Sequence, residues 1–248
     1  SLVAAKRIIL KKTEELQRTI AGRDKLYSVI AHDLRSPMGS IKMVLNMLML
    51  NLPVEKIGGE MYELLTMANR TTEDVFSLLD NLLKWTKSQI GNLNVVYQDI
   101  DAVEVMDSVI DVFNMIAGLK KITIREEKPE KLPVCADIDM LKTVIRNLLS
   151  NAIKFSNENS EVLVKMEEQG DMVVVSVKDN GCGIDEEGQK KLLHTDTHFS
   201  TFGTNNEEGS GLGLLLCQDF VVKNGGKLWF TSKQGEGSTF SFSIPLKK

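Results

Sequence analysis

Residues 31–37, AHDLRSP, bring together side chains suited to group transfer. The imidazole of His32 is a competent nucleophile and general base near neutral pH, and Asp33 beside it can orient the ring or accept its proton. Ser36 follows four residues after His32, so the two share one face of a helix. Pro37 lacks the amide hydrogen that a continuing helix needs, which predicts a kink that can act as a hinge. The alternatives are a structural histidine in a core, or an exposed one without a role.

A second polar group lies in the stretch DMLKTVIRNLLSNAIKFS at 139–156. Asn147, Asn151 and Lys154 are spaced four and three residues apart, so they line up along one side of a helix. Asparagine is a weak helix former, and amide oxygens suit Mg²⁺ while a lysine amine suits phosphate. This stripe therefore indicates a site for Mg²⁺ and a nucleoside triphosphate, and the alternative is that these side chains cap nearby loops.

Two glycine clusters, DNGCGI at 179–184 and GSGLGL at 209–214, flank an unusually long polar stretch. Glycines let backbone amides approach a phosphate chain, and a loop of this length is typical of a functional lid. Asp179 stands at a predicted strand end, where its carboxylate can accept a hydrogen bond from an exocyclic amine. The clusters match no dinucleotide-binding fingerprint, because Leu214 occupies the third glycine position, and no P-loop ending follows them.

Apolar residues at heptad spacing predict that a long helix carries the histidine. They recur every seven positions from Leu2 to Leu16, which indicates a coiled-coil entry. Further on, the apolar stripe centres near Ile30 and Ile41. At roughly 100° per residue, His32 lies about 180° from that stripe and is expected to face solvent.

A second helix is predicted from the apolar run between Met61 and Thr86, after turn residues at 51–60. Two long helices joined by a short turn form an antiparallel hairpin. One hairpin buries only one face of each helix, so we expect two copies to pair as a four-helix bundle.

From about residue 95, short β-branched runs alternate with helical segments, which predicts an α/β sandwich with helices on one face of a mixed sheet. In the last run, Phe240 and Ile244 alternate with serines, typical of a strand with one buried face. Helices are predicted at roughly 101–118, 137–156 and 211–223. The predicted strands are NVVYQDI, KITIREE, EVLVKMEE, MVVVSVKD, KLWFTS and STFSFSIP.

The composition limits the function classes. The chain has 248 residues and a formal net charge of −4, without the basic excess of nucleic-acid-binding proteins. Cys135, Cys182 and Cys217 form no CxxC pair, which favours reduced thiols in a cytoplasmic setting. The longest apolar run, at 43–50, is too short to cross a bilayer. We expect a cytoplasmic protein, or the cytoplasmic part of a membrane-anchored sensor, since Ser1 is not a methionine.

Five motifs in this order, AHDLRSP, NLLSNAIKF, DNGCGI, GSGLGL and GEGSTFSFSIP, resemble those of sensor histidine kinases of two-component signalling. The resemblance spans nearly the whole chain. It implies an α+β architecture in which residues 1–92 form a coiled-coil entry plus a dimerisation and histidine-phosphotransfer hairpin. Residues 93–248 would form a Bergerat-type catalytic ATP-binding domain.

The resemblance also implies roles for individual residues. His32 would be the phosphoacceptor, Asp33 would take the imidazole proton, and the Ser36 hydroxyl would orient water in a phosphatase reaction. The implied ATP and Mg²⁺ site contains the metal ligand Asn151 together with Asn147, Lys154, Asp179, Gly181, Gly183, Gly209, Gly211, Gly213 and Thr239. The implied partners are a second copy of the chain and a response-regulator receiver domain, with an aspartate as the final acceptor.

Two other readings use the same motifs. An ATPase of the wider Bergerat superfamily shares the nucleotide site, but AHDLRSP argues against it, and the helix stripe has Asn147 and Asn151 where such enzymes use an acid. A silent scaffold would bind nucleotide without transfer. The lid stretch resembles the family pattern only in part, with Phe202 where a basic residue could contact phosphate. Phe199 and Phe202 are expected to pack the lid against the domain.

Overall fold

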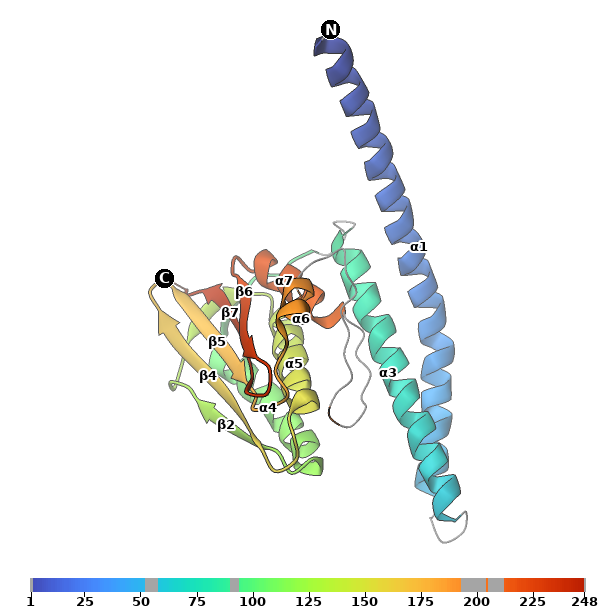
Figure 1. Ribbon diagram of the computed structural model, residues 1–248, viewed down its shortest axis with the longest axis vertical. Coiled ribbons are helices and arrows are strands. Elements are labelled where there is room, and N and C mark those ends of the chain that lie inside the picture. Colours follow the sequence, from blue (N-terminus) through green and yellow to red (C-terminus); the bar gives the residue numbers. More distant parts are fainter. Residues whose placement is uncertain (1, 52–57, 90–93, 193–203, 205–211, 248) are drawn as a thin grey trace. The chain divides into compact units, whose positions relative to one another are not determined.

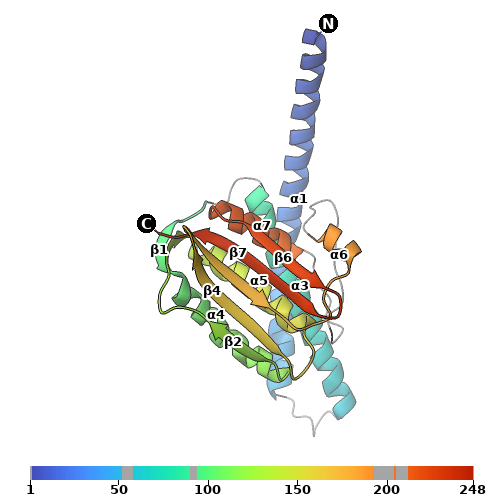
Figure 2. The ribbon, with the colours of Figure 1, turned by 60° about the vertical axis from the view of Figure 1, so that its left-hand side comes forward.

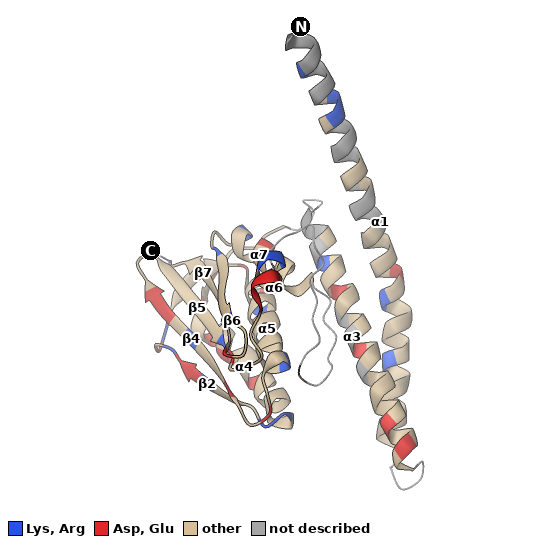
Figure 3. Ribbon diagram, in the orientation of Figure 1, with Lys and Arg blue, Asp and Glu red and all other residues tan. Residues whose placement is uncertain are grey.

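The computed structural model describes residues 2–51, 58–89, 94–192, 204 and 212–247 (Figure 1). The chain divides into two compact units, Ser1–Asn94 and Val95–Lys248. Figure 3 shows that acidic and basic residues occur along both units. None of the described helices has a stretch long and apolar enough to cross a membrane.

The first unit is an antiparallel helical hairpin of α1 (Leu2–Asn51) and α3 (Gly59–Gln89), which lie side by side in Figure 1. The helix α1 stays α-helical on both sides of Pro37, so the proline does not end it. The expected hinge at Pro37 stays a prediction. The turn expected at 51–60 falls largely outside the described residues.

The contact between the two helices has a small apolar centre. Ala31, Leu79 and Leu83 are buried there, with Met38 and Leu82 packed against them. The prediction that Ile30 and Ile41 mark the inner stripe of α1 is wrong for this contact, because both are exposed and Ala31 and Met38 face α3 instead. The predicted apolar heptad row of α1 is therefore exposed in a single chain.

Polar contacts join the same two helices along their length. Asp80 of α3 accepts a hydrogen bond from the Arg35 guanidinium and lies 3.0 Å from Nζ of Lys84. Further toward the turn, Nζ of Lys42 lies 3.2 Å from Oε1 of Glu73. Arg35 stands one turn after His32, so this ion pair fixes the part of α1 that carries the histidine.

The second unit is built on a five-stranded sheet in the order β2-β4-β5-β7-β6. Strand β2 (Thr123–Glu127) is parallel to β4 (Glu161–Gln169), and all other neighbours are antiparallel. The remaining strands of this sheet are β5 (Met172–Lys178), β6 (Leu228–Lys233) and β7 (Gly237–Pro245). The mixed sheet predicted from the sequence is confirmed.

Helices α4 (Ala102–Leu119), α5 (Ile138–Phe155) and α7 (Leu212–Lys223) lie behind the sheet in Figure 2, on one of its faces. This confirms the predicted sandwich. A two-stranded pair of β1 (Gln98–Asp101) with β3 (Pro133–Ala136) and the short helix α6 (Glu186–Lys191) complete the unit. The sequence analysis did not predict β3 or α6, which are four and six residues long.

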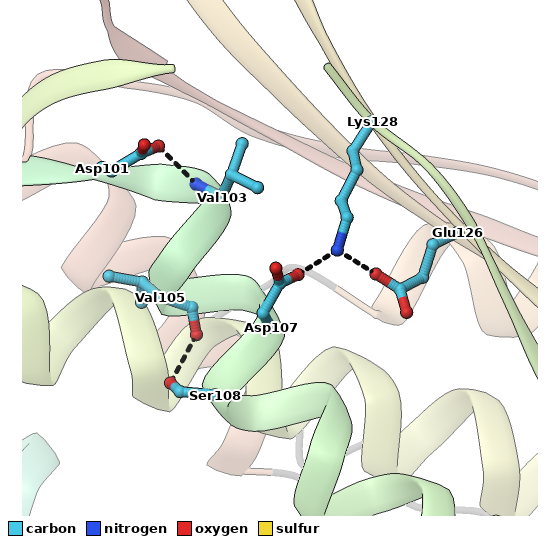
Figure 4. Close-up of polar contacts among 7 residues, drawn as sticks. All are labelled: Asp101, Val103, Val105, Asp107, Ser108, Glu126 and Lys128. Carbon is cyan, nitrogen blue, oxygen red and sulfur yellow. Dashed lines mark hydrogen bonds and ion pairs between the residues drawn. The ribbon is translucent and has the colours of Figure 1, made fainter. Parts of the chain in front are cut away.

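Aspartates cap the N-termini of α4 and α5, the two longest helices of the second unit. Asp101 accepts from the backbone N–H of Val103 at 3.0 Å, which satisfies a donor that the first turn of α4 leaves open (Figure 4). Asp137 does the same for α5, accepting from Asp139 and Met140. Figure 4 also shows Lys128 donating to both Asp107 of α4 and Glu126 of β2, which joins the helix to the sheet edge.

The expectation that β7 buries only one face is wrong. Ser241 and Ser243 are buried along with the apolar residues between them. The reason is that β7 lies between β5 and β6, so neighbouring strands cover its small side chains. The hydroxyls find partners there, since Ser241 Oγ lies 2.8 Å from Ser176 Oγ and Ser243 Oγ accepts from the Lys227 amide.

The apolar centre of the hairpin gives a stability prediction. Replacing Leu83 with Ala removes a side chain that is 3% exposed, and the cavity should lower the hairpin's free energy of unfolding by about 2–5 kcal/mol. Amide hydrogens of α1 and α3 should then exchange with deuterium faster. Leu50→Ala, at a position 84% exposed, is the matched control and should change this free energy by less than about 0.5 kcal/mol. Equal exchange in the two variants would contradict the assignment of this core.

Candidate functional site

The carboxylate of Asp179, directly after β5, is buried, with the residue only 3% exposed. Its Oδ1 accepts from the backbone N–H groups of Gly181 at 2.9 Å and Ser238 at 3.1 Å. Burial raises the pKa of Asp179, and these two amide hydrogen bonds only partly offset that effect. Both of these amide hydrogen bonds fall on Oδ1.

Three glycines of this region stand where no side chain fits. A Cβ on Gly181 would lie 2.1 Å from the carbonyl oxygen of Phe155, at the end of α5. Gly183 has φ +63° and would approach Lys233 O at 2.0 Å, and Gly237 has φ +94° and would approach Asp179 O at 2.1 Å. The loop 179–184 therefore packs directly on α5 and on the β6–β7 turn.

Hydrogen bonds hold this loop against both neighbours. Cys182 donates its backbone N–H to Phe155 O at 3.4 Å and accepts from Gly235 N–H at 2.7 Å. The Ile184 amide donates to Ser232 Oγ at 2.9 Å. Thr239 is half-buried on β7 in register with Lys178, the residue before Asp179. The structure thus places Asp179, Gly181, Gly183 and Thr239 in one region, and their role in binding stays a prediction.

The polar stripe of α5 leads away from this loop. Asn147, Asn151 and Lys154 are half-buried, while Leu148 and Ala152 between them are buried against the sheet. Asn147 Nδ2 donates to Thr143 O, and its Oδ1 would lie 3.1 Å from a Cβ on Gly213 of α7. The stripe therefore runs from the Asp179 loop to the N-terminal turn of α7.

The donor set suits a nucleotide with a divalent cation. In the described part of the chain, His, Cys, Asp and Glu side chains form no group of three that could hold a metal by themselves. Amide oxygens of the stripe are neutral ligands, so the negative charge must come from the ligand's phosphates. The start of α7, twelve residues long, has the first-turn backbone N–H groups and the positive helix-dipole end that suit a phosphate.

His32 lies in the other unit, on the exposed face of α1. Its side chain is 78% exposed, and its Nδ1 lies 3.2 Å from Oδ1 of Asp33. The expected solvent-facing position is confirmed, and the two adjacent side chains do make contact. Ser36 is exposed one turn further on, where its carbonyl oxygen accepts from Ser40 Oγ at 3.2 Å.

Four residues that the sequence analysis assigned to the site or the lid stretch lie outside the described residues: Gly209, Gly211, Phe199 and Phe202. Sequence reasoning missed Gly237, which the GEG in GEGSTF could have indicated, because that glycine immediately precedes the Ser238 whose N–H donates to Asp179. It also missed Lys120 and Thr204, whose contacts join segments that are far apart in the sequence.

Comparisons with known proteins identify relatives of this chain. The family model of histidine kinase-, DNA gyrase B- and HSP90-like ATPases matches residues 136–248. The adaptive-response sensory kinase SasA of Crocosphaera subtropica is 30% identical over 241 residues, which are 95% of this chain and 63% of that protein. The chain therefore spans somewhat less than two thirds of this relative.

Solved structures resemble the chain as well. The catalytic domain of histidine kinase ThkA is 30% identical with a TM-score of 0.53, covering 60% of this chain and 95% of that domain. Full-length ShkA in complex with AMPPNP has a TM-score of 0.69 at 20% identity, covering 90% of this chain and 46% of that one. At that identity, the second match speaks for the fold alone.

The buried carboxylate gives a prediction that separates binding from stability. Asp179→Asn keeps an oxygen for the amides of Gly181 and Ser238 but places an amide N–H₂ donor where we expect the exocyclic amine of adenine to be accepted. Binding of ADP, measured by calorimetry, should be lost. The free energy of unfolding at pH 8 should not fall, because the variant avoids burying a charge.

The pH dependence follows from the direction of the shift. Since the folded pKa of Asp179 is raised, the wild type is relatively more stable when this carboxyl is protonated. Any stability advantage of Asp179→Asn should therefore shrink as the pH falls from 8 toward 4 in urea titrations. A variant that binds ADP normally, or whose advantage grows on acidification, would contradict this role.

Proposed function

Because this chain belongs to the sensor histidine kinases of two-component signalling, we propose that it phosphorylates His32 from ATP and passes the phosphoryl group to a response-regulator receiver aspartate. The observation that carries the proposal is the exposed His32 imidazole with Asp33 at its Nδ1, in a chain that also has a buried Asp179 carboxylate within a glycine pocket. His32 would accept the phosphoryl group, and the region around Asp179 would bind the nucleotide.

Recognition of the base would fall to Asp179. Its Oδ2 would accept from the exocyclic amine of adenine, while Oδ1 is held by the Gly181 and Ser238 amides. A guanine presents a carbonyl oxygen at that position, so a carboxylate there favours ATP over GTP. Gly183 and Thr239 would line the same pocket from the loop and from β7.

The phosphates would lie along the stripe of α5. Asn151 would hold Mg²⁺ through its amide oxygen, with Asn147 and Lys154 beside the phosphate oxygens. When bound, Mg²⁺ neutralises charge on the phosphates and orients them for in-line transfer. Gly213 lets the start of α7 approach Asn147 closely, and Gly209 and Gly211, outside the described residues, would complete the triphosphate site.

The transfer step follows from the contacts of His32. Asp33 lies at Nδ1, so in the proposed step Nδ1 carries the proton and the lone pair of Nε2 attacks. A bond forms between Nε2 and the γ-phosphorus as the bond between that phosphorus and the bridging oxygen breaks, releasing ADP. Positive charge develops on the ring, and Asp33 stabilises it by taking up the Nδ1 proton.

The experiment that tests this function uses γ-labelled ATP with Mg²⁺. The wild type should incorporate label that is acid-labile and alkali-stable, as a phosphoramidate bond is. His32→Gln should abolish the label, because its side chain lacks a nucleophilic ring nitrogen, while ADP affinity should stay within about twofold of the wild type. Asp33→Asn should slow labelling by about tenfold or more, in line with general-base catalysis.

The other roles are tested with the same labelled protein. Ser36→Ala should keep the label and lose it more slowly, if the hydroxyl orients water. Mixing labelled protein with a panel of receiver domains should move the label from His32 to one of them. Label that persists in His32→Gln would place the acceptor elsewhere, and ADP binding without any label would support the scaffold alternative.

We also propose that the chain is a homodimer. Five large apolar residues of α1, Ile20, Tyr27, Leu34, Ile41 and Leu48, recur every seven positions and are 37% to 47% exposed. Such a heptad row is the seam of a helical bundle when a second copy covers it. Pairing two hairpins through this row would give a four-helix bundle.

The dimer prediction is tested by a charge in the row. Ile41→Lys places a charge in the apolar seam and should convert the protein from dimer to monomer at micromolar concentration, as measured by light scattering after size exclusion. Ser40→Lys adds the same charge at the adjacent exposed position and should remain dimeric. A dimeric Ile41→Lys would argue against this seam.

A further inference from the structure

Helix α4 has an apolar stripe that stays exposed, although the opposite side of the same helix belongs to the core of the second unit. The stripe consists of Val112, Met115, Ile116 and Leu119, which are 59%, 77%, 45% and 86% exposed. Their spacing of three and four residues aligns them on one face over two turns of helix. A row of large apolar side chains that faces solvent in this way is typical of an interaction surface.

The solvent-facing flank of this stripe is acidic. Glu104 and Asp111 are both exposed and stand seven residues apart, so they lie on the same side of α4, beside Met115. In the part of the chain that the structure describes, neither of these two carboxylates has an ion pair. The acid between them, Asp107, is directed toward Lys128 instead and is bound by it (Figure 4).

The stripe leads into a pocket at the start of α4. This cavity of about 320 Å³ is lined by three carboxylates and one amine, those of Asp99, Asp101, Glu104 and Lys142. Ser108 also lines it and stands one turn before Val112, so the pocket and the stripe are continuous along the helix. Asp99 already contacts Lys247 and Asp101 caps α4, which leaves Glu104 for a cation from a ligand.

We propose that this face of α4 is a docking surface for a basic amphipathic helix of another protein. The apolar side of that helix would pack on the stripe at 112–119, and a lysine or arginine on its flank would pair with Glu104 or Asp111. The inference does not depend on the phosphotransfer function proposed above.

Charge complementarity favours this occupant over the alternatives. A second copy of the chain would bring the same acidic flank and a formal net charge of −4, so like charges would meet across the contact. The anionic headgroups of a membrane surface would be repelled by Glu104 and Asp111 for the same reason. A basic helix satisfies both the apolar stripe and its acidic flank.

The test uses two synthetic helical peptides of about fourteen residues, or four turns, that share one row of leucines. One peptide carries lysines on the flanks of that row and the other carries glutamates. Their dissociation constants for the full chain are measured by fluorescence anisotropy at about 50 mM NaCl. The lysine peptide should bind at micromolar concentration, and the glutamate peptide should bind about tenfold or more weakly because it meets like charges.

Neutral substitutions in the stripe show where the lysine peptide binds. Met115→Gln combined with Leu119→Gln removes apolar surface without changing the charge and should raise the Kd about tenfold or more. Val222→Gln, on α7 at a position 61% exposed, is the control and should keep the Kd within about twofold. All three positions are exposed, so the midpoint of thermal unfolding should change by less than about 2 °C in either variant.

A second pair of variants tests the acidic flank. Glu104→Gln combined with Asp111→Asn keeps the side-chain shapes and removes both charges. The Kd of the lysine peptide should rise about fivefold at low salt and become less dependent on salt. Glu158→Gln combined with Glu168→Gln removes the same charge from exposed positions outside α4 and should keep the Kd within about twofold.

Three results would overturn the proposal. If Met115→Gln with Leu119→Gln left binding unchanged, the peptide would occupy another apolar surface, such as the heptad row of α1. Wild-type protein that binds neither peptide, or both equally, would show that this face has no preference for a basic helix. A fall in molar mass on the same double substitution, measured by light scattering, would assign the surface to a second copy of the chain.

Discussion

The carbonyl oxygens at the end of α5 are the point on which the nucleotide-binding unit depends. Lys120 donates to Ile153 O and Lys154 O, Thr204 donates to Lys154 O, and Cys182 donates to Phe155 O. A helix end left without partners in the interior would be costly, so these contacts are required by the helix itself. In meeting that requirement, they bring the Asp179 loop and Thr204 to the helix that carries the polar stripe.

The same requirement explains why side chains are absent beside this helix end. Gly181 must approach Phe155 O so closely that no Cβ fits, and Gly237 must turn with positive φ beside Asp179. The loop can then donate two amides to a carboxylate that is removed from water. Burial favours the protonated form of Asp179, so keeping this carboxylate ionised within the loop costs local stability.

Much of this arrangement could be predicted from the sequence, wherever a repeating pattern specified it. The heptads of α1, the four-and-three spacing of Asn147, Asn151 and Lys154, and the alternation in β7 each identified an element. The inner face of the hairpin was misplaced, because the heptad row is more apolar than the small Ala31 that packs on α3. The serines of β7 are buried because of the strand's place in the sheet, and sheet order is not a local pattern.

The contacts of Lys120 could not be predicted from the sequence for a different reason. They join α4, α5 and Thr204 across 33 to 84 residues of sequence. A single lysine after a helix carries no local sign that it is buried, since lysine at such a position is ordinarily solvated. Pairings of this kind depend on the completed fold, so composition and periodicity could not reveal them.

The order of strands in the sheet also bears on how the protein is made. Strand β7 lies between β5 and β6 and pairs with residues about seventy positions earlier, as Val175 does with Phe242. During synthesis the sheet therefore lacks an interior strand until residue 245 has left the ribosome. The hairpin of α1 and α3 depends on pairings within its first 89 residues, and its core can form much sooner. The nascent chain would present its histidine-bearing hairpin well before it can bind nucleotide.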